Sequence, residues 1–401
     1  MRELERLDIA LLTHSVNPRG GVVHTLSLAD ALHDRGHRVT VFAPAVPGQQ
    51  MFRATRCALD LVAVEAAARS VVDMVATRRA AFVACLSRQL QSNRFDVLHA
   101  QDAIGGNALA DLVERGEIAS FMRTVHHLDV FDEPQLMAWQ HRAYALASQV
   151  LCVSQGWCDR LQAEHGVSTS LVNNGVDLER YTPAARRDDD AVASRYGLRP
   201  GGPLFLAVGG VEARKNTVRT LQAFARFRAT HPGAQLAIAG GASLLDHDDY
   251  ARQFRTVLAG GDLRAHVAML GPVPDADMPA LLRLADVVLM PSLREGFGLV
   301  VLEALASGTP VVVSDLAPFT EYLAPDEQQD HACWADPVDV SSIERAMRRA
   351  LDPRHKLALA RGTPAVCERF SWQRSARDHE VLYRAHRALA RRPRSESLAH
   401  T

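Results

Sequence analysis

The chain has 401 residues, of which 47% are hydrophobic and 23% charged, the composition of an ordinary soluble globular protein of two or three domains. Lysine and arginine number 45 against 46 aspartates and glutamates, which argues against a chain that mainly coats nucleic acid. The six cysteines form no CxxC pair and are too few for a disulfide framework, so a reducing compartment is favoured.

Short apolar, β-branched runs alternate along the chain with longer amphipathic stretches. The expected strands are 7–13, 38–42, 96–99, 122–126 and 149–153, and then 204–208, 235–239, 266–270, 286–290 and 310–314. Helical windows fall between them, for example at 25–35, 218–229 and 341–351. Nearly continuous apolar runs such as LFLAV are typical of parallel strands covered on both faces. The alternation predicts an α/β protein with doubly wound parallel sheets.

The alternation occurs twice, which predicts two Rossmann-like domains. A polar stretch with two prolines and a double glycine, 181–202, reads as the linker. We therefore expect an N-terminal domain at 1–180 and a C-terminal domain at 203–371. The last segment, about 372–401, is expected to be a helix that crosses back to the first domain. Two such domains would face each other across a cleft lined by the carboxyl ends of strands.

The first expected strand leads into a glycine pair, Gly20 and Gly21, just before a helical stretch. Glycines at a strand-to-helix turn let backbone N–H groups approach an anion, and the positive end of the helix dipole favours it. This predicts a phosphate cradle. The alternative is a tight turn whose glycines serve backbone geometry alone. The motif is not GxGxxG, so a nicotinamide dehydrogenase is disfavoured.

The strand at 204–208 leads into a second glycine turn, Gly209 to Asn216, which contains Arg214 and Lys215. Two cations at the carboxyl end of a strand suit a diphosphate, since they stabilise charge on its oxygens. The alternative is a solvated basic turn.

The most informative stretch is 291–310, where an acidic residue and a glycine-rich turn precede an expected helix. The N–H groups of Phe297, Gly298 and Leu299 would be unpaired at the helix start and free to bind phosphate or sugar oxygens. Glu295 precedes this turn and Glu303 lies about two helical turns beyond it.

These segments together resemble the retaining glycosyltransferases of family 4, which have the two-domain GT-B fold. The matching segments are GGVVHTLSLADALHDRGHRVTVF, TVHHLDVF, VSQGWCDRLQAEHGVSTSLVNNGVDLERYTP, GGVEARKN and EGFGLVVLEALASGTPVVVSD. They occur in the family's order, and the similarity covers about 7–385. Two departures stand out. Gly210 occupies a place where many members carry arginine, and His127 follows His126 where many carry an acid.

The resemblance implies a role for each matching residue. Glu295 would contact the hydroxyls of the donor sugar, and Glu303 the ribose of the nucleotide. Lys215 would bind the donor diphosphate, helped by the N–H groups of 297–299, and Arg214 would supply the second cation that Gly210 lacks. His126 would lie near the reacting carbon.

In the first domain, Gly20 and Gly21 would approach the donor phosphate or the acceptor. Whether His126 or His127 faces the donor stays open at this point.

The implied reaction moves a hexosyl group from a nucleotide-sugar to the hydroxyl of a glycan, lipid or small molecule, with retention and without a metal or other cofactor. The acidic runs at 188–190 and 246–249 read as solvated loops. The alternatives are a nucleotide-sugar 2-epimerase of the same fold and a non-catalytic nucleotide-sugar or glycan binding protein. Loops near 240–243 and 271–274 would select the donor, and the acceptor is not readable.

The stretch 69–94 combines apolar residues with five arginines and one acid. A basic amphipathic helix of this kind can lie on an anionic membrane. The alternative is a helix that packs its apolar face on the sheet. No stretch approaches the roughly 18 apolar residues of a membrane span, and the short apolar run near the N-terminus is not expected to act as a signal peptide, which needs a longer apolar core. We expect a cytoplasmic protein, with a membrane contact through 69–94 if the acceptor is a lipid, and no nucleic-acid partner.

Overall fold

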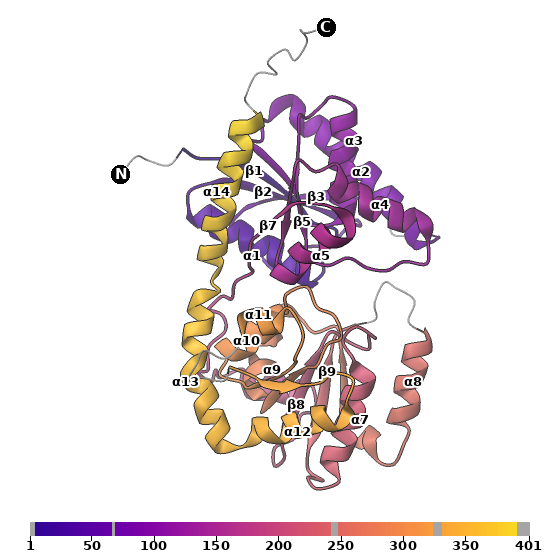
Figure 1. Cartoon of the computed structure of the whole chain (residues 1–401), viewed down its shortest axis with the longest axis vertical. Coiled ribbons are helices and arrows are strands. Elements are labelled where there is room, and N and C mark those ends of the chain that lie inside the picture. The colour runs from indigo at the N-terminus through magenta and orange to yellow at the C-terminus, as the bar shows by residue number, and fades with distance from the viewer. Residues whose placement is uncertain (1–4, 66–68, 242–247, 324–330, 391–401) are drawn as a thin grey trace. The chain divides into compact units, whose positions relative to one another are not determined.

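The computed structural model describes residues 5–65, 69–241, 248–323 and 331–390, and these residues form two compact units (Figure 1). Unit 1 holds the described residues up to Asn174 together with the helix that begins at Trp372, and unit 2 spans Gly175–Ser371. The end segments of unit 2 lie side by side, because the N–H of Val176 donates to the carbonyl of Phe370 at 2.9 Å.

The described part of unit 1 forms a seven-stranded parallel sheet in the order β3-β2-β1-β4-β5-β6-β7. Its strands are β1 (Asp8–Leu12), β2 (Arg38–Ala45), β3 (Ala58–Ala63), β4 (Val97–Ala100), β5 (Met122–Val125), β6 (Gln149–Cys152) and β7 (Thr169–Leu171). Its helices are α1 (Gly20–Asp34), α2 (Val71–Ser92), α3 (Ala103–Glu114), α4 (Pro134–Ala145), α5 (Gln155–His165) and α14 (Trp372–Ala390), the last of which packs against α1.

The described part of unit 2 forms a six-stranded parallel sheet in the order β10-β9-β8-β11-β12-β13. Its strands are β8 (Leu204–Val208), β9 (Gln235–Ala239), β10 (Val267–Gly271), β11 (Val287–Met290), β12 (Val311–Ser314) and β13 (Cys333–Ala335). Its helices are α6 (Asp189–Arg195), α7 (Thr217–Arg228), α8 (Asp248–Leu258), α9 (Met278–Leu284), α10 (Leu299–Ala306), α11 (Phe319–Tyr322), α12 (Val340–Leu351) and α13 (Pro353–Arg369), with 3₁₀ turns η1 (Leu263–Ala265) and η2 (Asp275–Asp277).

The α/β class and each expected strand are confirmed, with ends that differ by at most three residues. Three further strands, β3, β7 and β13, were not expected. All three lie at sheet edges; β7 and β13 have three residues each, and β3 leaves most of its side chains partly or fully exposed. A short or half-exposed strand lacks the continuous apolar run that marks a buried parallel strand.

Helix α1 begins at Gly20, five residues before the expected helical window. The glycine pair therefore forms the first turn of the helix and does not precede it. Glycine is a poor helix former, which hides the helix start in the sequence. Residues 181–202, expected as a linker, contain α6 and are counted in unit 2. There Asp189 pairs with Arg283 of α9 at 2.5 Å.

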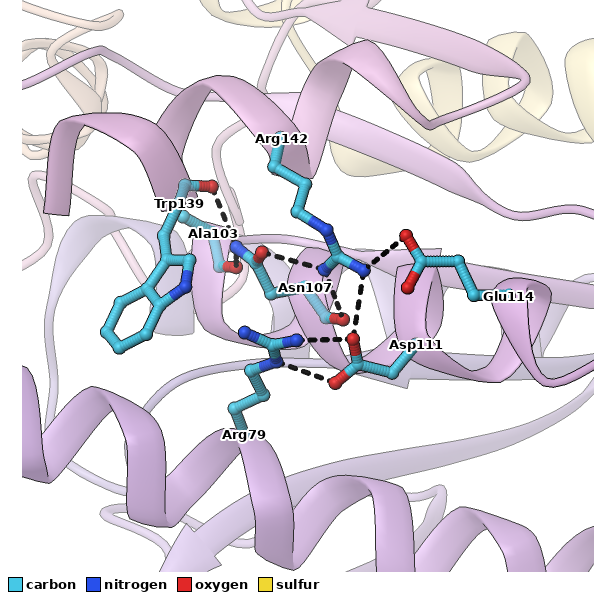
Figure 2. Close-up of polar contacts among 7 residues, drawn as sticks. All are labelled: Arg79, Ala103, Asn107, Asp111, Glu114, Trp139 and Arg142. Atoms are coloured by element: carbon cyan, nitrogen blue, oxygen red, sulfur yellow. Dashed lines mark hydrogen bonds and ion pairs between the residues drawn. The ribbon is translucent and has the colours of Figure 1, made fainter. Parts of the chain in front are cut away.

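Helix α2 packs its apolar face into unit 1. Phe82, Val83, Cys85 and Leu86 are buried in the core cluster that covers the sheet. Arg79 also points inward, where Asp111 of α3 accepts hydrogen bonds from Arg79 and from Arg142 of α4 (Figure 2).

The second inward arginine of α2 is Arg78, which donates to the carbonyl of His14 at 3.0 Å. Of the two alternatives for 69–94, the structure therefore shows the helix that packs its apolar face on the sheet. None of the described helices combines the length and the apolarity needed to cross a membrane.

Candidate functional site

The candidate residues fall into two clusters, one in each unit, and each lies at the carboxyl ends of parallel strands. The cation–carboxylate cluster of unit 2 consists of Glu212, Arg214, Lys215 and Glu295 and adjoins β8 and β11. The histidine cluster of unit 1 surrounds His126 after β5.

The turn after β8 needs its glycines for space as well as for conformation. Gly209 and Gly210 both have positive φ, at 126° and 73°. A Cβ on Gly209 would lie 2.7 Å from Cε of Lys215, so this glycine makes room for the lysine stem. A Cβ on Gly210 would lie 2.5 Å from the carbonyl oxygen of Gly241. The departure at Gly210 therefore has a packing reason in this chain, since any side chain there meets the neighbouring glycine turn.

The cation–carboxylate cluster is held by short ion pairs. Lys215 Nζ lies 2.6 Å from Glu295 Oε2, and Arg214 Nη1 lies 3.0 Å from Glu295 Oε1. Arg214 Nε lies 3.1 Å from Glu212 Oε2. Lys215 and Glu295 expose only 13% and 8% of their side chains. Burial lowers the pKa of Lys215, and the charge of Glu295 opposes that shift. The cluster places two cations and a sugar-binding type of carboxylate within direct contact.

Asn216 ties together the loops that carry this cluster. It is buried, takes the left-handed conformation at φ 61°, and donates to the carbonyls of Pro291 and Pro337 at 3.0 and 2.6 Å. The N–H of Leu293 also donates to the carbonyl of Arg214 at 2.8 Å. Neither Asn216 nor Glu212 was predicted as a site residue from the sequence. The signal that could have found them is their place in the GGVEARKN loop.

Helix α10 begins at Leu299, directly after Gly298. Gly298 has φ 86°, and a Cβ there would lie 2.6 Å from Cε1 of Phe319, so only glycine fits. The N-cap residue Gly298 offers no side-chain cap, and the N–H of Val301 donates to the carbonyl of Gly298 at 2.9 Å. The N–H groups of Leu299 and Val300 are therefore the ones that an anion could bind at this helix start. Phe297 contributes backbone alone, because its ring is buried and stacked on Tyr322 at 4.7 Å.

Glu303 lies on α10 and is buried. Its partner is Tyr181, whose hydroxyl hydrogen-bonds to it and whose pKa burial raises well above the ordinary value. Glu303 therefore belongs to unit 2 together with Arg214, Lys215 and Glu295.

In unit 1 the structure brings Gly21 against His126, whereas a Cβ on Gly20 would meet nothing within 4 Å. A Cβ on Gly21 would lie 3.5 Å from Cδ2 of the His126 ring, so the first turn of α1 passes directly against that ring. Arg19, at the N-cap of α1, provides no side-chain cap. The first turn of α1 and the imidazole of His126 therefore lie side by side.

The two adjacent histidines have different surroundings. His126 is partly buried, and its Nε2 lies 3.2 Å from Oε1 of Gln101. Burial lowers the pKa of His126 well below its ordinary value. His127 exposes 40% of its side chain and pairs with Asp129 at 3.4 Å. Within unit 1, His126 is the histidine that faces the first turn of α1.

Two more histidines lie fully buried beneath His126. The ring of His24 meets that of His126 edge-on at 4.6 Å, and its Nδ1 lies 2.8 Å from Oδ1 of Asn174. His379 of α14 lies 6.0 Å from His24. Burial lowers the pKa of His24 to about 3 and that of His379 to about 4. Both are therefore neutral at ordinary pH.

Chemically, the unit 2 cluster can hold a diphosphate, since it combines two cations with an uncapped helix start. Glu295 can accept hydrogen bonds from sugar hydroxyls. Within 5–65, 69–241, 248–323 and 331–390, no three His, Cys, Asp or Glu residues are grouped so as to hold a metal ion. Of the acidic run expected at 246–249, residues 246 and 247 lie outside the described residues, as do 242 and 243 of the donor-selecting loop.

The chain matches two family models. Residues 18–180 match "Glycosyltransferase Family 4" and residues 188–371 match "Glycosyl transferases group 1". A phosphatidyl-myo-inositol mannosyltransferase of Mycobacterium tuberculosis is 30% identical over 343 residues, which cover 83% of this chain and 84% of the relative. A glycogen synthase of the same species is 33% identical over 229 residues, 56% of this chain. The matched part of this chain spans half the length of that glycogen synthase.

Solved structures share the fold. The Anabaena protein HepE, solved in complex with UDP and glucose, has a TM-score of 0.74 at 17% identity, and the match covers 95% of this chain and 100% of that one. The expected GT-B class is confirmed.

Proposed function

The chain belongs to the family 4, group 1 glycosyltransferases, and from this premise we propose that it transfers a hexosyl group from a nucleotide-sugar to an acceptor hydroxyl. The proposal includes retention of configuration at the anomeric carbon and independence of a metal ion. The observation that carries it is the contact of Lys215 and Arg214 with Glu295 in unit 2.

The cluster suits the departure of a nucleoside diphosphate. A nucleotide-sugar is already activated, so the enzyme has to orient it and stabilise the charge that develops on the leaving oxygens. Lys215, Arg214 and the uncapped start of α10 supply that positive potential. Glu295 would hold the sugar hydroxyls, and Glu303, oriented by Tyr181, would hold the ribose.

In this mechanism the bond from the anomeric carbon to the diphosphate breaks, and a bond to the acceptor oxygen forms on the same face. The acceptor proton passes to an oxygen of the departing phosphate, so no side chain needs to act as a base. A neutral His126 near the reacting carbon is compatible with this, because an uncharged imidazole does not compete with Lys215 and Arg214 for the diphosphate.

The donor class has support from a structural neighbour, since HepE was solved with UDP and glucose. Thermal-shift screening against UDP-, GDP- and ADP-sugars would identify the donor of this chain, because a ligand that binds the folded state raises its stability. With that donor, Glu295→Gln and Lys215→Ala should each reduce turnover severely while the variants remain folded. Near-normal rates in both would reject the assignment of the site.

A membrane contact through 69–94 stays in the proposal in a narrower form. The apolar face of α2 is used in the core and Arg78 and Arg79 are bound internally, so the contact would be electrostatic, through the exposed Arg69, Arg88 and Arg94. Co-sedimentation with anionic vesicles at low salt should then fall when these three arginines become glutamine. Equal sedimentation of variant and parent would remove the membrane from the proposal.

A further inference from the structure

Gln101 follows β4 directly, is buried, and touches the candidate catalytic histidine. We infer that Gln101 is a positioning residue that holds His126 in the tautomer with its proton on Nε2, so that Nδ1 is left as the acceptor nitrogen of the ring. The catalytic meaning of this inference rests on the proposed function. Its structural content does not, because the tautomer can be measured without any substrate.

The contact itself sets the tautomer. Oε1 of Gln101 lies 3.2 Å from Nε2 of His126. An amide oxygen carries no proton, so a hydrogen bond between these atoms requires the ring to donate from Nε2. In a neutral imidazole the other nitrogen, Nδ1, is then an acceptor.

His99 fixes which end of the Gln101 amide faces His126. The Nδ1 and Nε2 atoms of His99 each have a hydroxyl partner at 2.8 Å, from Tyr383 and Thr124 respectively. The amide nitrogen of Gln101 lies 3.3 and 3.5 Å from these same two ring nitrogens. Because the in-plane directions are occupied, the amide nitrogen lies over the face of the ring.

An N–H group over an electron-rich ring face is attractive, whereas a carbonyl oxygen there is repelled. The amide therefore keeps its nitrogen on His99 and its oxygen on His126. His99, Thr124 and Tyr383 are all fully buried, so these hydrogen bonds lie away from bulk solvent, where they are electrostatically stronger. Tyr383 of the C-terminal helix α14 is thus linked to the ring of His126 through two intervening residues, His99 and Gln101.

The groups that face His126 also favour the neutral form of its ring. His24 of α1, His99 of β4, Arg123 of β5 and the adjacent His127 each disfavour a positive charge on it, and burial does so most strongly. A carboxylate in place of the amide would reverse that balance, because it would stabilise the imidazolium.

The test uses the full chain labelled with ¹⁵N-histidine, with the His126 signals assigned from their loss in His126→Asn. At pH 7.5 the parent should show a proton bonded to Nε2 of His126 and an unprotonated Nδ1. In Gln101→Met, which keeps the side-chain length but removes the acceptor, the Nε2 proton should lose its protection from exchange. The matched control is Gln89→Met, whose amide donates to Asp60, and it should leave the His126 signals unchanged.

Gln101→Glu gives an independent readout, should Gln101→Met not fold. Its carboxylate keeps the acceptor, so it should raise the pKa of His126, followed by NMR titration, by about one unit or more. A parent with the proton on Nδ1, or a pKa unmoved in Gln101→Glu, would overturn the inference.

Turnover separates the inference from the proposed function. We expect kcat/KM to fall about ten- to hundredfold in Gln101→Met, the range found when an outer partner of a functional histidine is removed. If the parent transfers no sugar, the proposed function fails while the tautomer measurement still stands. If the tautomer is as expected but kcat/KM is unchanged in Gln101→Met, the positioning role is refuted.

Discussion

Replacement of Lys215 by methionine separates the electrostatic role of the cation–carboxylate cluster from its structural role. Methionine has nearly the length of the lysine stem, so it fills the space beside Gly209 without a cavity. Lys215 lies 2.6 Å from Glu295, yet Arg214 remains 3.0 Å from the same carboxylate after the change. Loss of one partner from a buried pair costs about 3–5 kcal/mol when the other charge is left alone.

Because Arg214 still compensates Glu295, we expect the free energy of unfolding to fall by less, about 1–2 kcal/mol. A charge-assisted hydrogen bond to the diphosphate contributes about 1.5–3 kcal/mol, so its loss should raise the Kd of the nucleoside diphosphate about 10- to 150-fold. Stability is measured by urea unfolding and affinity by calorimetry, with the nucleotide that stabilises the parent most.

The double variant Lys215→Met with Glu295→Gln removes both charges of the pair. It should recover most of the lost stability, whereas its nucleotide affinity should stay well below that of the single variant Glu295→Gln. The matched control is Lys356→Met, which changes the only other lysine of the chain, a half-exposed residue paired with Asp286 at 3.5 Å. It should affect neither quantity. Parent-like affinity in Lys215→Met, or a double variant that binds the nucleotide as tightly as Glu295→Gln alone, would refute the assignment of Lys215 to the diphosphate.

Three further predictions concern Glu295, Gly298 and the two buried histidines His24 and His379. Glu295→Gln should raise the affinity for the free nucleoside diphosphate severalfold, because it frees Lys215 and Arg214 from their ion pairs. It should also lower the rate of sugar transfer at least tenfold. Calorimetry measures the affinity and a turnover assay the rate, and weaker diphosphate binding would contradict the prediction. Gly298→Ala should destabilise the protein by about 1–2 kcal/mol or more, because this residue has φ 86° and an added Cβ would meet Phe319. Gly20→Ala, where an added Cβ meets open space, should not destabilise it. Equal urea-unfolding midpoints for the two variants would contradict the prediction. The folded pKa values of His24 and His379 are about 3 and 4, below the value of about 6.5 in the unfolded chain, so the unfolded chain binds more protons as the pH falls below 6.5. The free energy of unfolding should therefore drop by about 2 kcal/mol per histidine between pH 7.5 and 5. Urea unfolding should show a weaker pH dependence in His379→Leu.

The sequence predicts the strands of both sheets wherever they are buried on both faces. Leu204–Val208 and Val287–Met290 are continuous apolar runs of this kind. The edge strands β3, β7 and β13 carry weaker patterns, because an edge needs no continuous apolar run. The start of α1 is hidden for another reason: Gly20 and Gly21 read as a turn by local propensity, whereas in the structure they form the first turn of the helix, with Gly21 against the ring of His126.

The candidate site, like the fold, could be predicted from the sequence only in part. Lys215 and Glu295 can be picked from their motifs, but their direct contact cannot, since it depends on β8 and β11 being neighbours in the sheet. Gln101 carries no sequence signal at all. It becomes visible because β4 pairs with β5 and so brings Gln101 beside His126. Residues that act through a second side chain are found only when the strand order is known.

The most direct test of the central claim follows the anomeric proton of the donor sugar by NMR. The donor selected by thermal shift is incubated with the chain, with and without candidate acceptors. The account predicts that the donor signal is lost in an acceptor-dependent way and that a glycoside of the same anomeric configuration appears. Loss of the donor to its 2-epimer without an acceptor, a glycoside of inverted configuration, or no change with any tested nucleotide-sugar that binds would contradict it.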